Sequence, residues 1–543
     1  MAVPARPHQV LVPSRFRIEA ASRHPRLGRD YDPATHSYRA SYVNPAAYTI
    51  TVDAFPGKTL LFNKGDIQHR PGTDPRDARD IWRLDGPKDT TGWQFKIEGR
   101  PARKMPFGPR PPRFTAEHTT RLVTMKGEFH EDRDTNAWNW HINVPGPGTY
   151  VVAVTRLRGA NTAAPRVATL DVEDLLVVSI GDSAASGQGN PDVPGEPRGF
   201  DPDLSFWDIL NPASGLFKLT KAAVNWAADL IKTKFTSAAR LGDAKIAMDP
   251  APVWLEPLAY RSLRSGPAHA ARLLEDRGKG RLITFLSFGR TDSTILNGLI
   301  GPRRSDGRPG DRWAGNLGQL DELARTIGRR HIHAVLIYIG VNDVGVSGNL
   351  TDLVAADLVG SDTLGDPTRN RKAVEARAKV NLAALPEKIQ TLATALTRLD
   401  VGQVYLTEYP TSLFDDAAGN PQAGCGVFTN PGMNLSRQDA VLVKSLAEKL
   451  NAALKAAATA HGWFYVSGIA AAFKGHGYCA GKTFFVGAEE SMLLQGDTEG
   501  MVHPNPEGSR IIGEMIAAAV RQHTVNTPRP GSHGPQGPLA PTG

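Results

Sequence analysis

Three short motifs in this sequence place a serine, an amide and an imidazole next to predicted secondary-structure elements. Gly-Asp-Ser at 181–183 and Gly-Val-Asn-Asp at 340–343 each follow an apolar run, and His-Pro-Asn-Pro at 503–506 precedes a helical pattern. A serine hydroxyl becomes a nucleophile when an imidazole takes its proton, and the same imidazole can then protonate a leaving group. An asparagine amide can donate a hydrogen bond to a developing oxyanion, whereas an aspartate cannot. Together these residue types indicate nucleophilic attack on a carbonyl carbon.

The elements that must position these motifs begin at about residue 174. From there, continuous apolar runs alternate with long helical patterns, which is typical of strands buried on both faces. The expected strands are 175–180, 282–288, 334–339, 403–409 and 463–467, and the expected helices are 266–276, 317–328, 371–399, 436–461 and 506–522. We therefore predict an α/β domain over residues 173–523, with a doubly wound parallel sheet of about five strands. Such sheets place their sites at the carboxyl ends of the strands, where the first two motifs lie.

The preceding region has a different pattern. Between residues 48 and 172, short alternating runs are separated by turn residues, which predicts an all-β, immunoglobulin-like sandwich over 41–172. Such a module either contacts a carbohydrate or surface partner or is purely structural, and we expect its Trp138 and Trp140 in the core. Residues 1–40 form a poorly determined leader, and the tail at 524–543, with five prolines and four glycines, is expected to be disordered.

Composition excludes several other classes. The net charge is +8, but both signs alternate along the chain, so we expect no nucleic-acid partner. No apolar run reaches the roughly 18 to 20 residues that span a bilayer, and the first residues lack a signal-peptide pattern. Two cysteines are too few for a four-cysteine zinc site. We expect neither a metal nor an organic cofactor.

The three motifs, in this order, resemble the GDSL or SGNH hydrolase family of esterases and lipases over about residues 174–522. Segments 260–271, 294–301 and 475–479 resemble its actinobacterial branch. The resemblance implies that Ser183 is the nucleophile and also donates its backbone N–H to the oxyanion, that His503 is the base, and that Asn342 is an oxyanion-hole donor.

Members of that branch often pair cysteines, which implies a disulfide between Cys425 and Cys479. The alternative is two buried thiols. A disulfide would imply an oxidising compartment and so hints at export, but the sequence leaves the location open.

Two positions depart from the family pattern. Gly500 occupies the place of the usual acid, three residues before the histidine. Asp497 is the first replacement candidate, with Glu499 nearby, and the alternative is a dyad in which a backbone carbonyl holds the imidazole. Asp292 stands where the family has a glycine that donates a backbone N–H to the oxyanion hole, and Gly289 is the alternative donor.

We therefore predict a serine esterase that acts on carboxylic esters, of lipid or sugar type, through an acyl-enzyme. One alternative is an acyltransferase using the same site. The other is a binding module that has lost activity through the missing aspartate and Asp292. The apolar segment 204–235 is either a lid over the site or part of the core.

Overall fold

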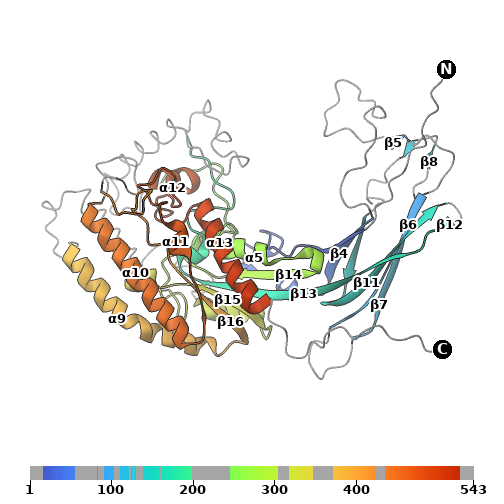
Figure 1. Cartoon of the computed structure of the whole chain (residues 1–543), viewed down its shortest axis with the longest axis horizontal. Coiled ribbons are helices and arrows are strands. Elements are labelled where there is room, and N and C mark those ends of the chain that lie inside the picture. Colours follow the sequence, from blue (N-terminus) through green and yellow to red (C-terminus); the bar gives the residue numbers. More distant parts are fainter. Residues whose placement is uncertain are drawn as a thin grey trace, which may run out of the picture. The chain divides into compact units, whose positions relative to one another are not determined.

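The computed structural model describes most of the residues of the chain. These are 16–54, 82–83, 91–102, 111–121, 124–125, 128–129, 139–158, 161–198, 245–303, 317–345, 371–423, 425 and 435–525. They divide into two compact units (Figure 1). The first comprises residues 1–23, 45–174 and 275–282, and the second comprises 24–44, 175–274 and 283–543.

The second unit contains the predicted parallel sheet. Its strand order is β14 (Arg281–Ser287), β13 (Arg166–Gly181), β15 (Ile332–Tyr338), β16 (Val401–Thr407) and β17 (Phe464–Val466). The pairs β13–β15, β15–β16 and β16–β17 are parallel. The chain therefore moves from β13 to β14 on one side and to β15, β16 and β17 on the other. This creates a topological switch point between β13 and β15, where open α/β sheets place their ligands.

Helices predicted from the sequence are present between these strands. The helical elements of the unit are α1 (Ala40–Val43), α2 (Ser183–Ser186), η3 (Pro257–Ala259), α5 (Gly266–Leu274), α6 (Gln319–Ile327), α7 (Val341–Val344), α9 (Arg371–Leu396), α10 (Arg437–Ala460), α11 (Ile469–Phe473), α12 (Ala488–Gln495), α13 (Pro506–Val520) and η7 (Arg521–Val525). Helix α13 packs against α5, and α10 lies beside α9 (Figure 1). Helix α13 begins as expected, because Asn505 caps it by accepting a hydrogen bond from the Gly508 N–H and Pro506 takes the first helical position.

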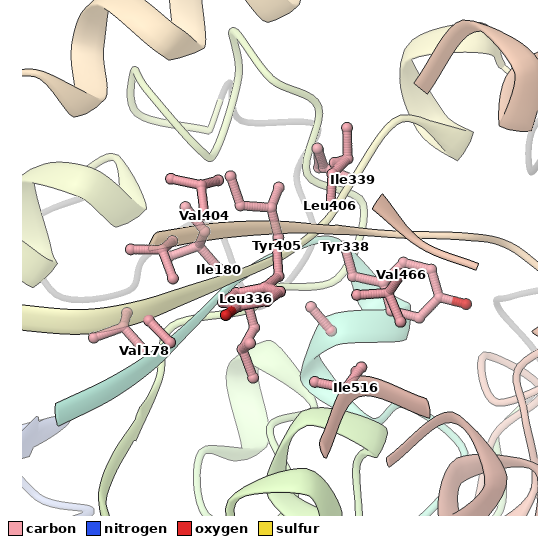
Figure 2. Packing of buried hydrophobic residues seen from close by; sticks show 14 of the residues in the cluster. Val178, Ile180, Leu336, Tyr338, Ile339, Val404, Tyr405, Leu406, Val466 and Ile516 are labelled. Atoms are coloured by element: carbon pink, nitrogen blue, oxygen red, sulfur yellow. The ribbon is translucent and has the colours of Figure 1, made fainter. Parts of the chain in front are cut away.

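The core of this unit lies on both faces of the sheet. Alternate residues of β16 project to opposite sides, and Figure 2 shows Val404 on one side and Ile516 of α13 on the other. The N-terminal segment contributes buried aromatic side chains to the same cluster: Tyr31, Tyr38 and Tyr42. The hydroxyls of Tyr38 and Tyr42 bond to main-chain groups of β14. Residues 24–44, which include β2 (Tyr31–Asp32) and β3 (Ser37–Tyr38), therefore belong to the α/β unit.

The first unit consists of antiparallel sheets. One contains β1 (Arg17–Ala20), β4 (Tyr48–Asp53) and β10 (Asn139–Val144). The other contains β7 (Phe114–Arg121), β6 (Thr91–Pro101), β11 (Gly148–Arg158) with β12 (Asn161–Thr162), and the first part of β13. Short strands β5 (Trp82–Arg83), β8 (Thr124–Met125) and β9 (Glu128–Phe129) form a third, and η4 (Arg277–Lys279) completes the unit.

The two larger sheets contribute to a single hydrophobic cluster. Ile50 and Val52 of β4 share it with Phe95 of β6 and Val152 of β11. Trp140 is 9% exposed and belongs to the same cluster, so it is a core residue, as expected. Trp138, the segment 204–235 and the tail beyond 525 lie outside the described residues.

Two further findings concern the whole described chain. Cys425 and Cys479 are joined by a disulfide bond, as the resemblance implied. No helix in the described ranges has both the length and the apolar character needed to cross a bilayer.

Candidate active site

The first side chain of the site, Ser183, is positioned by a tight strand-to-helix turn. Strand β13 ends at Gly181, and Ser183 is the first residue of α2. Gly181 has φ +146°, and a Cβ there would lie 2.0 Å from the carbonyl oxygen of Tyr338. Only glycine fits this position. As the first helical residue, Ser183 has a backbone N–H for which the helix supplies no carbonyl.

Asp182 stabilises this turn through two hydrogen bonds. Its carboxylate caps α2 by accepting a 3.0 Å hydrogen bond from the Ala184 N–H, and it also accepts one from the Tyr409 hydroxyl. Burial raises the pKa of Asp182 to about 7, although the hydrogen bond from Tyr409 acts in the opposite direction. Asp182 is therefore engaged in holding the turn.

The imidazole of His503 faces the serine. Its Nε2 lies 2.7 Å from Ser183 Oγ, although the two residues are 320 positions apart in the chain. Two side-chain amides connect the segment that follows Ser183 to the loop that carries His503. Gln188 Nε2 donates to the Glu499 carbonyl at 2.6 Å, and Asn190 Nδ2 donates to the Pro504 carbonyl at 2.7 Å.

Main-chain oxygens hold the other imidazole nitrogen. His503 Nδ1 lies 2.8 Å from the Met501 carbonyl oxygen and 3.3 Å from that of Gly500. A carbonyl can only accept a hydrogen bond, so the Nδ1 atom carries the hydrogen. In this tautomer, Nε2 of the neutral ring is free of hydrogen and can accept the serine proton.

Asp497 is engaged elsewhere. Its carboxylate accepts hydrogen bonds from the Tyr260 hydroxyl at 2.6 Å, from Gln495 Nε2, and from the Glu499 N–H at 3.0 Å. Burial raises its pKa, and the bonds from Tyr260 and Gln495 oppose that effect. The geometry thus joins Ser183 and His503 but directs Asp497 toward Tyr260.

Burial lowers the pKa of His503 below its usual value of 6.5. The hydrogen bonds to the Met501 and Gly500 carbonyls act in the opposite direction, as does the negative charge of Asp292. The neutral form of the ring, which is the form able to act as a base, is therefore favoured at neutral pH.

The loop after β14 lies beside the serine turn. The Arg290 N–H donates to the Gly181 carbonyl at 3.1 Å. Two residues later, Asp292 has φ +55°, a left-handed conformation that glycine adopts most readily. Its carboxylate forms an ion pair with Arg303 at 3.2 Å. Asp292 thus has the backbone conformation expected of the glycine that it replaces, and its charge is partly balanced.

Asn342 belongs to α7 and contacts the same loop. Its Nδ2 donates to the Ser293 carbonyl at 3.1 Å. This bond uses one of the two amide hydrogens and fixes the orientation of the amide. The following residue, Asp343, accepts a hydrogen bond from the Ile295 N–H at 2.9 Å, so both residues join α7 to the loop after β14.

Gly289 has a packing role in this arrangement. A Cβ at this position would lie 2.7 Å from the backbone nitrogen of Ser186 in α2. Its carbonyl accepts a 2.9 Å hydrogen bond from Arg261 Nε. Glycine at 289 therefore allows the loop to approach α2 closely.

Gln319 is a residue that the sequence motifs did not indicate. Its side chain pairs with both main-chain groups of Gly181, at 2.8 Å to the nitrogen and 2.7 Å to the oxygen, and also bonds to Ser293 Oγ at 3.1 Å. The side chain is fully buried. Its only sequence signal is a polar residue at the start of a helix, which is too common to be informative.

Two residues beside the site, Asp292 and Val502, have left-handed backbone conformations. Within the described ranges, four non-glycine residues have positive φ, namely His36, Tyr260, Asp292 and Val502. Tyr260 contacts Asp497, Asp292 follows β14, and Val502 precedes His503. Strain of this kind persists where surrounding contacts over-determine the backbone, as at many functional sites. No group of three or more His, Cys, Asp or Glu side chains in the described part of the chain could hold a metal ion.

Comparison with known proteins identifies one family. Residues 253–511 match the GDSL-like Lipase/Acylhydrolase family, a range that begins after Ser183 and contains Asn342 and His503. No curated protein matches the chain.

Several solved structures are similar at low identity. The extracellular lipase from Streptomyces rimosus is 17% identical, covering 64% of this chain and 99% of its own, with a TM-score of 0.37. Phospholipase A1 from Streptomyces albidoflavus NA297 is 16% identical, covering 64% and 98%, with a TM-score of 0.35. A family two carbohydrate esterase from Clostridium thermocellum is 11% identical, covering 80% and 89%, with a TM-score of 0.25. These likenesses are too distant to assign a substrate.

Proposed function

The chain carries a GDSL-like lipase/acylhydrolase domain, that of a serine hydrolase acting on esters, and we propose that Ser183 and His503 perform its chemistry. The observation that carries this proposal is the 2.7 Å contact between Ser183 Oγ and His503 Nε2. Ester hydrolysis through an acyl-enzyme needs this pair, because a serine hydroxyl attacks a carbonyl only as its proton leaves.

In the first step, Ser183 Oγ attacks the ester carbonyl while its proton moves to His503 Nε2. The imidazolium then gives this proton to the leaving alcohol, which leaves an acyl group on the serine. Water enters, loses a proton to the same Nε2, and attacks the acyl carbon. The proton returns to Ser183 as the acid departs, so the enzyme is restored.

The oxyanion formed in each step requires donors on one side of the serine. We assign this role to the backbone N–H of Ser183, the backbone N–H of Asp292 and the side-chain amide of Asn342. The left-handed backbone of Asp292 and the bond from Asn342 to the Ser293 carbonyl support the assignment. Gly289 is the weaker candidate because it packs against α2.

The third member of the site is the Met501 carbonyl rather than a carboxylate. It accepts the Nδ1 hydrogen at 2.8 Å and so selects the tautomer in which Nε2 is the base. An aspartate would also stabilise the imidazolium by its charge, whereas a carbonyl contributes only its dipole. The site is therefore a dyad of Ser183 and His503 in which a backbone carbonyl holds the imidazole. The Asp497 carboxylate accepts a hydrogen bond from the Tyr260 hydroxyl instead.

We also propose that the two units have different roles. The unit at 24–44, 175–274 and 283–543 holds every residue of the site. The shared core of the two antiparallel sheets supports a β-sandwich in the other unit, either as a contact module for a carbohydrate or surface partner or as a structural module. Lipid and sugar esters both remain substrate classes for the site.

The test uses Ser183→Ala beside Ser412→Ala, a matched control whose hydroxyl is buried and bonds to the Phe473 carbonyl. Both proteins and the wild type are treated with a fluorophosphonate probe and with p-nitrophenyl esters from acetyl to palmitoyl. Wild type and Ser412→Ala should be labelled and active, whereas Ser183→Ala should be neither. Labelling that persists in Ser183→Ala would place the nucleophile elsewhere.

The same panel measures acyl preference. Adding an alcohol acceptor to the wild type separates hydrolysis from acyl transfer, since a transferase would form a new ester in preference to the free acid.

A further inference from the structure

The orientation of His503 depends on the backbone of residues 500–503, because its Nδ1 contacts carbonyls of that segment. Val502 lies within it and has φ +63°. A β-branched residue rarely adopts this conformation, so other contacts must hold it there.

Tyr478 supplies one of those contacts. Its hydroxyl accepts a 2.9 Å hydrogen bond from the Val502 N–H and donates one to the Val486 carbonyl. The Val502 N–H also reaches that carbonyl at 3.1 Å, and the Val486 N–H donates to the His503 carbonyl at 2.9 Å. The hydroxyl thus joins the chain segment at Val486 to the loop that carries His503.

Tyr478 itself is firmly placed. Its ring packs beside Phe414 and Phe485, each with a centroid separation of 5.9 Å. Its backbone N–H donates to the Leu413 carbonyl at 2.8 Å. The next residue, Cys479, is bonded to Cys425. A fixed hydroxyl can impose an unfavourable conformation on a neighbouring residue, whereas a mobile one cannot.

We propose that Tyr478 is a positioning residue for His503, which holds Val502 in its left-handed conformation so that the Met501 and Gly500 carbonyls meet Nδ1. In a site without a carboxylate partner, the position of these carbonyls decides which imidazole nitrogen carries the hydrogen. The inference rests on the proposed function, in which His503 is the base. Tyr478 does not contact the reacting atoms and acts through the loop.

The test is Tyr478→Phe, which keeps the ring and removes the hydroxyl. We expect kcat/KM to fall about tenfold through kcat, with KM nearly unchanged, because transition-state alignment is lost while substrate binding is kept. The matched control is Tyr150→Phe in the other unit, whose hydroxyl also bonds to a main-chain carbonyl, that of Gly146, at 2.7 Å. Tyr150→Phe should keep wild-type kcat/KM.

Two further measurements separate positioning from general destabilisation. Activity is normalised to the folded fraction by circular dichroism at the assay temperature. The ¹⁵N spectrum of labelled histidines, with His503→Ala used to assign the His503 signals, reports the tautomer. Tyr478→Phe should shift the His503 signals from the Nδ1–H tautomer toward a mixture, whereas Tyr150→Phe should not.

Wild-type kcat/KM in folded Tyr478→Phe, or an unchanged His503 tautomer, would overturn the proposal. Ser183→Ala, assayed in parallel, distinguishes this failure from failure of the proposed function. An inactive Ser183→Ala with a fully active Tyr478→Phe would remove only the role of Tyr478. An active Ser183→Ala would remove the proposed function as well.

Discussion

His503 Nδ1 lies 2.8 Å from the carbonyl oxygen of Met501, a residue only two positions before it. The group that orients the imidazole is therefore part of the same loop as the imidazole itself. A main-chain carbonyl is neutral at every pH, so this orientation does not depend on the ionisation of a partner. It also contributes less to stabilising the imidazolium than a carboxylate does.

The role of Asp497 can be tested by Asp497→Asn. Because its carboxylate contacts Tyr260 and Gln495, we expect kcat/KM to fall less than about tenfold, or about 1.4 kcal/mol of barrier. Steady-state kinetics on a p-nitrophenyl ester measures this, with Glu499→Gln as the control from the same loop. A loss of several orders of magnitude in Asp497→Asn alone would restore Asp497 as the third catalytic residue.

Asn342→Ala should lower kcat by roughly 10² to 10³, the usual effect of removing one oxyanion donor, with little change in KM. The reason is that, in the proposed mechanism, the amide donates to charge that develops only in the transition state. Asn381→Ala is a matched control, since its amide donates to the Val344 carbonyl at 3.3 Å, also in the α7 region. If Asn342→Ala changed KM alone, the amide would bind substrate in its ground state.

The pH dependence of kcat/KM follows from the lowered pKa of His503. Since burial favours the neutral imidazole, activity should persist below pH 6.5 and fall only as the pH drops through the lowered pKa. The charge of Asp292 opposes this shift, so Asp292→Asn should move the acid limb to still lower pH. Asparagine tolerates the left-handed backbone, which keeps the loop conformation. A limb at or above pH 6.5 in the wild type, or an upward shift in Asp292→Asn, contradicts this account.

A buried ion network should dominate the stability of the loop after β14. Arg261 is fully buried and bonds to both carboxylate oxygens of Glu322 at 3.2 Å, and Arg290 contacts the same carboxylate at 3.3 Å. Glu322→Gln removes the carboxylate charge that these two buried cations share. We expect the free energy of unfolding to fall by about 3 to 5 kcal/mol.

Urea denaturation followed by tryptophan fluorescence measures the effect of Glu322→Gln. The control is Glu507→Gln, which removes an exposed partner of Arg510 and should change stability by less than about 1 kcal/mol. Equal losses in the two variants would show that burial of the network adds nothing.

The sequence by itself determined the main strands and the long helices of the α/β unit, and it predicted the contact between Ser183 and His503. The expected strands and helices are present because an apolar run buried on both faces, or an amphipathic repeat, depends on local composition. Ser183 and His503 could be predicted as partners because the motifs lie at the carboxyl end of β13 and the start of α13, and parallel folds bring such ends together.

Only the tertiary structure decided what surrounds that pair. The Met501 carbonyl carries no side-chain signal, and every residue has such a carbonyl, so a sequence cannot mark it as the partner of Nδ1. Gln319 lies in helix α6 and contacts Gly181, which is 138 positions earlier in the chain. Tyr31 packs in the core of the α/β unit, although it lies in the segment 1–40, which the sequence predicted to be a leader. Such contacts arise between residues distant in sequence, with no local pattern to mark them, and so appear only once the chain is folded.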